Sequence, residues 1–251
     1  MGSKSRIAKY IVPVIQKYID DNNICCYIEP FVGGANVIDK ITCEKRIGID
    51  LNKYLIALLK HVQEEKPLLD EVPRELYNKA RESFNNGDTS SFEDWEIGCI
   101  GFLASYNGRF FDGGFAKSGF EKTKYGLRLR DYYKESKNNL LNQGSNLKSI
   151  NFMVGDYKEM RGYRNCMIYC DPPYQNTKHY KQSNTSAAFY FDYKCFWETM
   201  RNWSKDNIVL ISEQTAPDDF ECIWEKEVSR SVRAIDKSKA TEKLFIYKEL
   251  L

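Results

Sequence analysis

The stretch Asp171-Pro172-Pro173-Tyr174 places a carboxylate, two prolines and an aromatic ring directly after the apolar run Met167–Cys170. Two successive prolines fix φ and supply no backbone N–H, so we expect their carbonyls to stand as unpaired acceptors beside the carboxylate. Asp171 and the Pro172 carbonyl would accept both N–H groups of an exocyclic amine, and Tyr174 would stack on a planar ring. This chemistry suits the amino group of a heteroaromatic base. The alternative is a strand that ends in a Pro-Pro turn with a solvated aspartate.

The elements around this stretch predict where it lies. The run 167–170 has the pattern of a buried strand, and in open α/β sheets ligands bind at the edge where such strands end. Further strands are expected at 25–28, 47–49, 149–154, 207–211, 221–228 and 243–248, and helices at 5–20 (interrupted near Pro13), 53–62, 74–84, 92–103 and 196–203. This alternation predicts a three-layer α/β sheet with one antiparallel edge.

A glycine-bearing loop, Glu29–Val37, follows the strand expected at 25–28. Glycines between a strand and a helix let the backbone approach a ligand, and the helix N-terminus adds partial positive charge. The loop lacks the Gly-Lys-Ser/Thr ending of a phosphate-binding loop, so a triphosphate is not expected. Asp50 follows about twenty residues later, where dinucleotide-type folds hold a ribose. Together they indicate a nucleoside cofactor, although Asp50 would also serve as the N-cap of the helix at 53–62.

Composition excludes several classes of protein. The chain has 251 residues, 42% of them hydrophobic and 29% charged, with no apolar run near the ~18 residues that span a bilayer. We therefore expect a cytoplasmic globular protein without a membrane partner. The eight cysteines show no Cys-x-x-Cys pair and there are two histidines, which favours reduced thiols over disulfides or a metal site.

Positive charge is concentrated in one segment. Residues 106–148 carry nine Lys or Arg against four Asp or Glu, interleaved with aromatic residues, whereas the whole chain has a net charge of +2. Such a mixture is typical of surfaces that bind a phosphate backbone and unstacked bases, although a solvated helix face would look similar. The segment from 66 to 147 also interrupts the strand–helix alternation, so we expect an inserted, mostly helical lobe.

An ordered set of motifs resembles the Dam-type DNA adenine N6-methyltransferases. The set comprises Glu29-Pro30-Phe31-Val32-Gly33, Asp50, Gly155-Asp156-Tyr157, Asp171-Pro172-Pro173-Tyr174 and Ser212-Glu213, and it covers nearly the whole chain. Gly2-Ser3-Lys4 also resembles the Gly-Gly-Lys segment that opens this family. Lys4 would then point a cation into the site, whereas without the resemblance it would be a surface lysine.

The resemblance implies an S-adenosylmethionine-dependent enzyme with a Rossmann-like sheet. Residues 1–65 and 148–251 would form the catalytic domain, and 66–147 the target-recognition lobe that binds double-stranded DNA. The implied cofactor-binding residues are Lys4, Phe31, Gly33, Gly34, Ala35, Asp50, Asp156, Tyr157 and Asp171. Asp171, Pro172 and Tyr174 would be catalytic, acting on an adenine flipped from the duplex. The family usually has a second glycine where Ala35 stands here.

The implied DNA-binding residues are Asn107, Arg109, Phe111, Lys117, Lys122, Lys124, Arg128 and Arg130. The recognition site would be short, GATC or a related sequence, with neither a metal ion nor an obligate protein partner inferred. Three alternatives remain open at this point: an N4-cytosine methyltransferase, a catalytically silent DNA-binding protein on the same fold and, with less support, a small-molecule or RNA methyltransferase.

Overall fold

The computed structural model describes residues 3–123, 126–173, 191–229 and 239–250. The chain divides into two compact units, each described by itself. Within the described ranges, the sheet unit comprises residues 3–49, 155–173 and 191–250, and the lobe unit comprises residues 50–154. Tyr174, Lys124 and the polar segment expected after Tyr174 lie outside the described residues.

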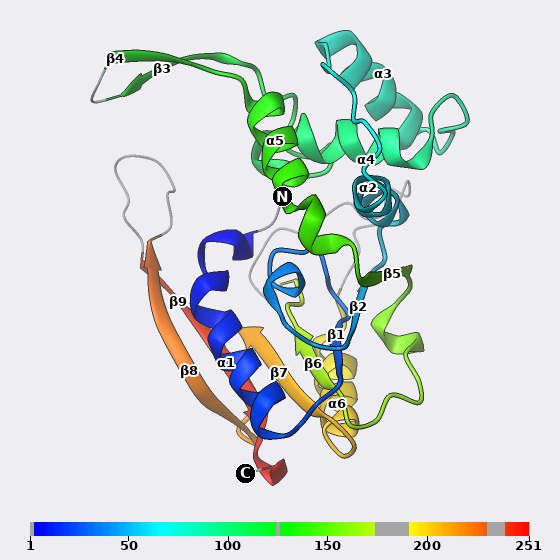
Figure 1. The fold of residues 1–251 in the computed structure, drawn as a ribbon. Helices are drawn as coiled ribbons and strands as arrows, with labels where there is room; N and C mark the ends of the chain where they lie inside the picture. Colours follow the sequence, from blue (N-terminus) through cyan, green and yellow to red (C-terminus); the bar gives the residue numbers. More distant parts are fainter. Residues whose placement is uncertain (1–2, 124–125, 174–190, 230–238, 251) are drawn as a thin grey trace. The chain divides into compact units, whose positions relative to one another are not determined.

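The main sheet has seven strands in the order β5-β2-β1-β6-β7-β9-β8. They are β1 (Cys26–Glu29), β2 (Lys45–Asp50), β5 (Ile150–Val154), β6 (Met167–Cys170), β7 (Ile208–Glu213), β8 (Phe220–Ser229) and β9 (Lys239–Tyr247). β2, β1, β6 and β7 are mutually parallel, whereas β9 runs antiparallel to β7 and to β8 (Figure 1). The predicted α/β sheet with one antiparallel edge is confirmed, and the order of its parallel strands reverses between β1 and β6 as in doubly wound folds.

Alternating side chains of these strands build a core on each face. Ile28, Ile168 and Ile211 belong to one buried cluster with Phe196 and Met200 of α6 (Tyr193–Trp203). α1 (Ala8–Asp21) packs on β6, and Figure 1 shows it in front of the sheet with α6 behind. The sheet unit is therefore layered as helix, sheet and helix.

α1 forms because its apolar residues recur at helical spacing. Ile11, Ile15 and Ile19 are buried along one stripe. Pro13 lies inside the helix without ending it, so the interruption expected there does not occur. A 3₁₀ turn, η1 (Ser3–Arg6), precedes the helix and is joined to it by a hydrogen bond from Ile7 N to Lys4 O of 3.0 Å.

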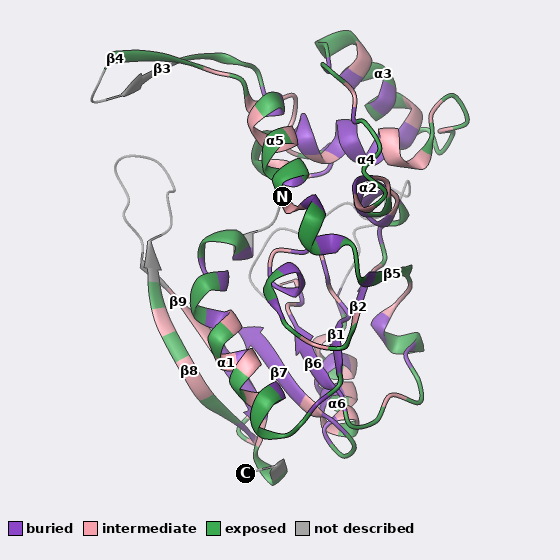
Figure 2. Cartoon of the chain, in the orientation of Figure 1, coloured by how far each residue is buried: buried purple, intermediate pink, exposed green. Residues whose placement is uncertain are grey.

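Besides β5, the lobe unit contains helices and a two-stranded ribbon. The helices are α2 (Lys53–Gln63), α3 (Arg74–Asn85), α4 (Asp94–Leu103) and α5 (Tyr132–Leu147), and the ribbon pairs β3 (Gly119–Thr123) with β4 (Gly126–Arg130). α4 is largely buried, whereas β4 is exposed along most of its length (Figure 2). A Cβ atom on Gly98 would lie 2.2 Å from the Tyr54 carbonyl oxygen, so only glycine permits this approach of α4 to α2.

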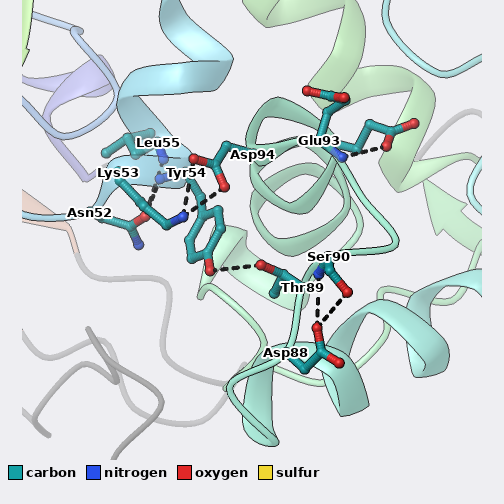
Figure 3. A network of polar contacts seen from close by, with 10 residues as sticks. Asn52, Lys53, Tyr54, Leu55, Asp88, Thr89, Ser90, Glu93 and Asp94 are labelled. Atoms are coloured by element: carbon teal, nitrogen blue, oxygen red, sulfur yellow. Dashed lines mark hydrogen bonds and ion pairs between the residues drawn. The ribbon is translucent and has the colours of Figure 1, made fainter.

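Polar contacts fix the start of α2 against α4 (Figure 3). The side chain of Asn52 accepts hydrogen bonds from Tyr54 N at 3.0 Å and Leu55 N at 3.1 Å, which makes Asn52 the N-cap of α2. The Lys53 ammonium lies 2.8 Å from the Asp94 carboxylate at the start of α4. The helix expected at 53–62 is confirmed, but the cap proposed for Asp50 belongs to Asn52.

The described residues contain no helix long and apolar enough to cross a membrane. The same part of the chain shows no group of three or more His, Cys, Asp or Glu arranged to hold a metal ion. All eight cysteines are free thiols.

Candidate active site

The carboxyl ends of β1 and β6 lie side by side. The two strands run parallel, with Ile28 paired to Ile168, so Glu29 and Asp171 come to the same edge of the sheet. Ile168 and Cys170 point into the cluster beneath α6, so the alternate positions Tyr169 and Asp171 face the opposite side. This edge, where the order of the strands reverses, is where open α/β sheets bind ligands.

Lys4 of η1 is paired with Asp171 in this structure. Its ammonium nitrogen lies 3.1 Å from Asp171 Oδ1, and the side chain is 7% exposed. Burial acts to lower the pKa of Lys4, but the nearby carboxylates of Asp171 and Glu242 outweigh it and raise the pKa above its ordinary value. Lys4 is therefore a buried cation and not a surface lysine.

Glu242 of β9 completes this polar cluster. Its carboxylate forms an ion pair with the same Lys4 ammonium and accepts a hydrogen bond of 2.6 Å from the Ser212 hydroxyl. Ser212 is fully buried on β7. We use the term anchoring cluster for Lys4, Asp171, Ser212 and Glu242.

A hydrogen bond fixes the carbonyl of the second proline after Asp171. The Tyr193 hydroxyl of α6 donates a hydrogen bond of 2.6 Å to the Pro173 carbonyl. The expectation that both proline carbonyls are unpaired is therefore wrong for Pro173, because α6 supplies a donor that the sequence around the prolines does not reveal. The contact ties the end of the turn to α6.

Glu29 at the end of β1 is almost completely buried. Burial raises its pKa well above the ordinary value, a hydrogen bond from Tyr27 opposes this, and the charges of Asp171 and Asp39 raise the pKa further. The Tyr27 hydroxyl donates to Glu29 Oε1 at 2.7 Å. The site thus favours the neutral acid at Glu29 and the ionised form at Asp171, which has a cation beside it.

The loop after β1 contains a tight turn. Ala35 N donates to Val32 O at 2.9 Å, and both Gly33 and Ala35 have positive φ angles, 50° and 56°. Glycine adopts this left-handed region without strain, whereas alanine does so at a cost. The second glycine of the resembled family thus falls at a position where this backbone favours glycine.

Two of the expected cofactor-binding residues are in ring contact. Phe31 and Tyr157 have ring centroids 5.2 Å apart, and Phe191 lies 5.9 Å from Phe31. Tyr157 belongs to a 3₁₀ turn, η4 (Tyr157–Glu159), whose N-cap Asp156 accepts a hydrogen bond of 3.0 Å from Lys158 N. The structure therefore brings Phe31 together with Tyr157, and Lys4 with Asp171.

Asp50 is the last residue of β2 and belongs to the lobe unit. Its carboxylate accepts a hydrogen bond of 2.9 Å from Asn52 N. This contact supports the start of α2 together with the Asn52 cap.

The loop expected to read DNA follows α4. Asn107 is exposed in a short turn, η3 (Tyr106–Gly108), and Arg109 forms an ion pair with Asp112. Phe111 is 6% exposed and packs on Tyr77 at 5.6 Å between ring centroids. In this structure Phe111 is part of the aromatic core beneath the loop, and Asn107 and Arg109 are its more accessible residues.

The remaining basic residues of this set lie on or near the ribbon. Lys117 is exposed before β3. Arg128 and Arg130 lie on β4, and their guanidinium groups are 3.2 Å and 2.9 Å from the two carboxylate oxygens of Glu135 in α5. Lys122 is in β3, but its side chain lies outside the described residues, as does Lys124.

Two members of the anchoring cluster were absent from the site residues expected from sequence. Ser212 belongs to the Ser212-Glu213 motif, which by itself gives it no role, and Glu242 lies in no motif. Glu242 lies in the charged stretch Lys-Ala-Thr-Glu-Lys at the start of β9, 71 positions from Asp171 along the chain. Nothing in that stretch distinguishes it from a surface glutamate.

Known proteins are similar to this chain. Type II methyltransferase M.MjaIII from Methanocaldococcus jannaschii is 29% identical over 198 residues, which cover 69% of this chain and 67% of that protein. The solved structure of the rRNA methyltransferase aviRa from Streptomyces viridochromogenes aligns with a TM-score of 0.41 at 8% identity, covering 97% of this chain and 84% of the other.

A match to a family model shows the family to which the chain belongs. The sequence model of the D12 class N6 adenine-specific DNA methyltransferases matches residues 1–241, which is nearly the whole chain. The motifs at the carboxyl ends of β1 and β6 are those by which the sequence resembles adenine methyltransferases. The protein therefore belongs to the D12 class N6 adenine-specific DNA methyltransferases, enzymes that use S-adenosylmethionine to methylate the N6 amine of adenine in DNA.

Proposed function

We propose that Asp171 and the Pro172 carbonyl hold the N6 amine of an adenine that is flipped out of a short site in double-stranded DNA. The observation that carries this assignment is the position of Asp171 after β6, beside the end of β1, with its carboxylate 3.1 Å from the buried Lys4 ammonium. A flipped base presents its amine to such acceptors, whereas a stacked base does not. Tyr174 is proposed to stack on the adenine ring.

The sheet unit offers surroundings that fit the cofactor. When bound, S-adenosylmethionine supplies a methyl group on a positively charged sulfur. The anchoring cluster contains two carboxylates, those of Asp171 and Glu242, and negative charge of this kind favours a cation nearby. Phe31 and Tyr157 provide aromatic surface, and the turn of Gly33 and Ala35 exposes backbone. These features support the choice of cofactor-binding residues.

Individual roles follow from this fit. Phe31 to Ala35, including Gly34, are proposed to lie along the cofactor, Asp50 to hold its ribose hydroxyls, and Asp156 with Tyr157 to contact its adenine. Lys4 is proposed to act at the cofactor site through the charge that it places beside Asp171.

Asp171 is proposed to act as a hydrogen-bond acceptor and not as a base before methyl transfer. A neighbouring ammonium favours the ionised carboxylate, which makes it a weak base. The lone pair of adenine N6 is delocalised into the ring, so hydrogen bonds that favour a pyramidal nitrogen would direct the lone pair at the methyl carbon. The work of these residues is positioning, together with exclusion of water. As the bond between nitrogen and the methyl carbon forms, the bond from that carbon to sulfur would break, and the positively charged nitrogen would then lose a proton to the Asp171 carboxylate.

DNA recognition is proposed for the lobe. Asn107 and Arg109 would contact bases, with Phe111 holding the shape of their loop from below. Lys117, Lys122, Lys124, Arg128 and Arg130 would contact phosphates, since a β-ribbon of this kind fits the major groove of DNA. The site read is proposed to be GATC or a related short sequence.

The proposal includes the division of the chain into domains. Residues 1–65 and 148–251 are proposed as the catalytic domain and residues 66–147 as the recognition lobe. The enzyme would work in the cytoplasm, where its cysteines stay reduced, and without an obligate protein partner.

The central test is the Asp171→Ala variant. We expect its kcat for methyl transfer to fall by at least about 100-fold, because the amine loses its charged acceptor. Binding of a DNA duplex and of S-adenosylmethionine, measured by fluorescence anisotropy and calorimetry, should change little. Asp206→Ala removes an aspartate whose side chain is 52% exposed and serves as the matched control. Near-normal transfer by Asp171→Ala with intact DNA binding would show that the assignment is wrong.

A second experiment tests the recognition site. Plasmid treated with the enzyme should resist restriction enzymes that are blocked by adenine methylation within the site. Methylation-sensitive sequencing would then give the sequence, and mass analysis of the nucleosides should show N6-methyladenine. Finding N4-methylcytosine would contradict the role given to Asp171 and Pro172.

A further inference from the structure

We propose that Glu242 is a positioning residue for the methyl-transfer reaction and acts on Asp171 through Lys4. The inference rests on the proposed role of Asp171 and extends it to a strand that carries no recognised motif. Glu242 does not touch the reacting atoms in this proposal; it fixes where the charge of Lys4 lies.

The first step is the connection between the strands. The Ser212 hydroxyl of β7 donates to Glu242 Oε1 at 2.6 Å, and the same oxygen contacts the Lys4 ammonium. Ser212 pairs with Leu244 of β9 in the sheet, so Glu242 is its diagonal neighbour, two residues along that strand. β7 therefore fixes Glu242, Glu242 fixes Lys4, and Lys4 fixes Asp171.

The second step concerns the cost of burying a cation. The Lys4 side chain is 7% exposed, and an ammonium removed from water needs partners for its N–H donors. Asp171 has to share its carboxylate with the substrate amine in the proposed reaction. Glu242, with a side chain 13% exposed, supplies a second anion, so Lys4 stays paired while Asp171 turns its charge toward the amine.

The third step is the charge of the cluster. The N6 nitrogen gains positive charge as it bonds to the methyl carbon, so net negative charge beside it stabilises the transition state. The Glu242 carboxylate contributes one negative charge beside the Lys4 ammonium. Without that charge, the positive charge of Lys4 would act more strongly on Asp171.

Burial favours the neutral forms of the ionisable groups on β1 and β6 beside Asp171. Burial raises the pKa of Glu29 on β1 well above its ordinary value. Burial likewise raises the pKa of Tyr169 and of Cys170 on β6, with Asp171 adding to both shifts. Glu213 on β7 lies near Tyr193 of α6, the residue bound to Pro173. The acid limb of the kcat profile is therefore expected to report Asp171 with Lys4 and Glu242.

The experiment compares Glu242→Gln, Lys4→Met and Asp171→Asn in methyl-transfer assays across pH, with the full chain and a DNA duplex. Glutamine keeps an oxygen that accepts from Ser212 and Lys4 but has no charge. We expect Glu242→Gln to lower kcat about tenfold, with KM for DNA and for S-adenosylmethionine within about twofold. The acid limb of its pH profile should move to lower pH. The reason is that Lys4 still favours the ionised form of Asp171, while the neighbouring charge of Glu242 has been removed.

Lys4→Met should move the acid limb in the opposite direction, to higher pH, because two facing carboxylates retain a proton more readily. Glu225→Gln on β8 is the matched control. Its side chain is 64% exposed and lies 3.8 Å from Lys243, so we expect wild-type kcat and an unshifted profile. Glu242→Asp keeps the charge and should restore part of kcat.

The outcomes separate the two proposals. Suppose that Asp171→Asn is inactive, while Glu242→Gln and Glu242→Asp both have the same kcat and pH profile as Glu225→Gln. In that case Glu242 has no positioning role and the role of Asp171 stands. If Asp171→Asn methylates DNA normally, the proposed function fails and this inference fails with it. Thermal unfolding shows which variants fold. If Glu242→Gln does not fold, Glu242→Asp decides the question: wild-type kcat together with an unshifted acid limb of its pH profile overturns the inference.

Discussion

At the scale of single residues, Ala35 shows how a departure from a family pattern can be weighed in energies. Its φ of 56° lies in the left-handed region, which costs an L-residue about 1–2 kcal/mol. Its side chain is completely buried, so the methyl group contributes about 0.8 kcal/mol. Alanine also loses less backbone entropy on folding than glycine, by about 0.4–1 kcal/mol. The three effects nearly cancel, which explains why alanine is tolerated in this turn.

The prediction at this position compares two substitutions. Ala35→Gly should change the free energy of unfolding by less than about 1 kcal/mol, because relief of strain offsets the lost methyl group and the added entropy. Ala35→Val should destabilise by more than about 2 kcal/mol, since a β-branched residue is a true outlier at positive φ. Urea unfolding measures both. Equal destabilisation by glycine and valine would show that the positive φ at position 35 does not determine how substitutions change the free energy of unfolding.

The limits of sequence reasoning are also visible at this scale. The roles expected for Phe31 and Tyr157, and for Lys4 and Asp171, came from motifs, and the structure places the members of each pair in contact. Glu242 could not be found in this way, because its place depends on the register of β9 against β7. A one-residue slip would turn its side chain to the other face of the sheet.

At the scale of elements, the β3–β4 ribbon was not expected from the sequence. β4 alternates leucine and arginine, and Phe120, Leu127 and Leu129 are 75%, 74% and 62% exposed. Phe120 pairs with Leu129, so these side chains share one face while Arg128 and Arg130 occupy the other. Strand patterns are recognised by burial of one face, and here the described apolar side chains are exposed. The lobe is helical as expected in α3 and α4, but neither the ribbon nor α5 was assigned.

The ribbon's arginines give a test of DNA contact. The pair between Arg128 and Glu135 is exposed, so it contributes little, and phosphate competes with it readily. We expect Arg128→Gln to weaken duplex binding at all sequences and to reduce the slope of log K against log salt by about 1. Anisotropy titrations at several salt concentrations measure this. Lys205→Gln, an exposed lysine of the sheet unit, is the control, and an unchanged slope for Arg128→Gln would exclude this phosphate contact.

At the scale of the whole molecule, stability should depend on pH through Glu29. Its folded-state pKa is raised, first by burial, above the ordinary value of about 4.3. Between these two values the folded chain holds a proton that the unfolded chain has lost. The stability due to this group is therefore complete below about pH 4 and declines as the pH rises toward the folded pKa.

Glu29→Gln removes this dependence, because glutamine cannot ionise while its oxygen still accepts from Tyr27. The difference in free energy of unfolding between Glu29→Gln and the wild type should therefore shift in favour of the variant as the pH is raised. Thermal or urea unfolding at a series of pH values measures it. Parallel curves for the two proteins would show that Glu29 does not couple folding to protons.

The alternation of strands and helices predicted the sheet unit well, because its central strands are short runs of buried residues. The lobe was harder to predict from the sequence, because its core contains aromatic rings from separate segments. Phe84 of α3 and Phe110 after α4 are an example, with ring centroids 4.9 Å apart. Contacts of that kind have no period in the sequence.

Trp95 of α4 lies in the lobe unit, whereas the other three tryptophans, Trp197, Trp203 and Trp224, belong to the sheet unit. The imidazole of His61 in α2 stacks on Trp95, with ring centroids 3.8 Å apart and an angle of 18° between the planes. An imidazole in such contact quenches the fluorescence of an indole by accepting an electron from its excited state. The lobe therefore contains its own optical reporter, whose emission should brighten when α2 and α4 separate. Melting of the lobe can thus be followed separately from that of the sheet.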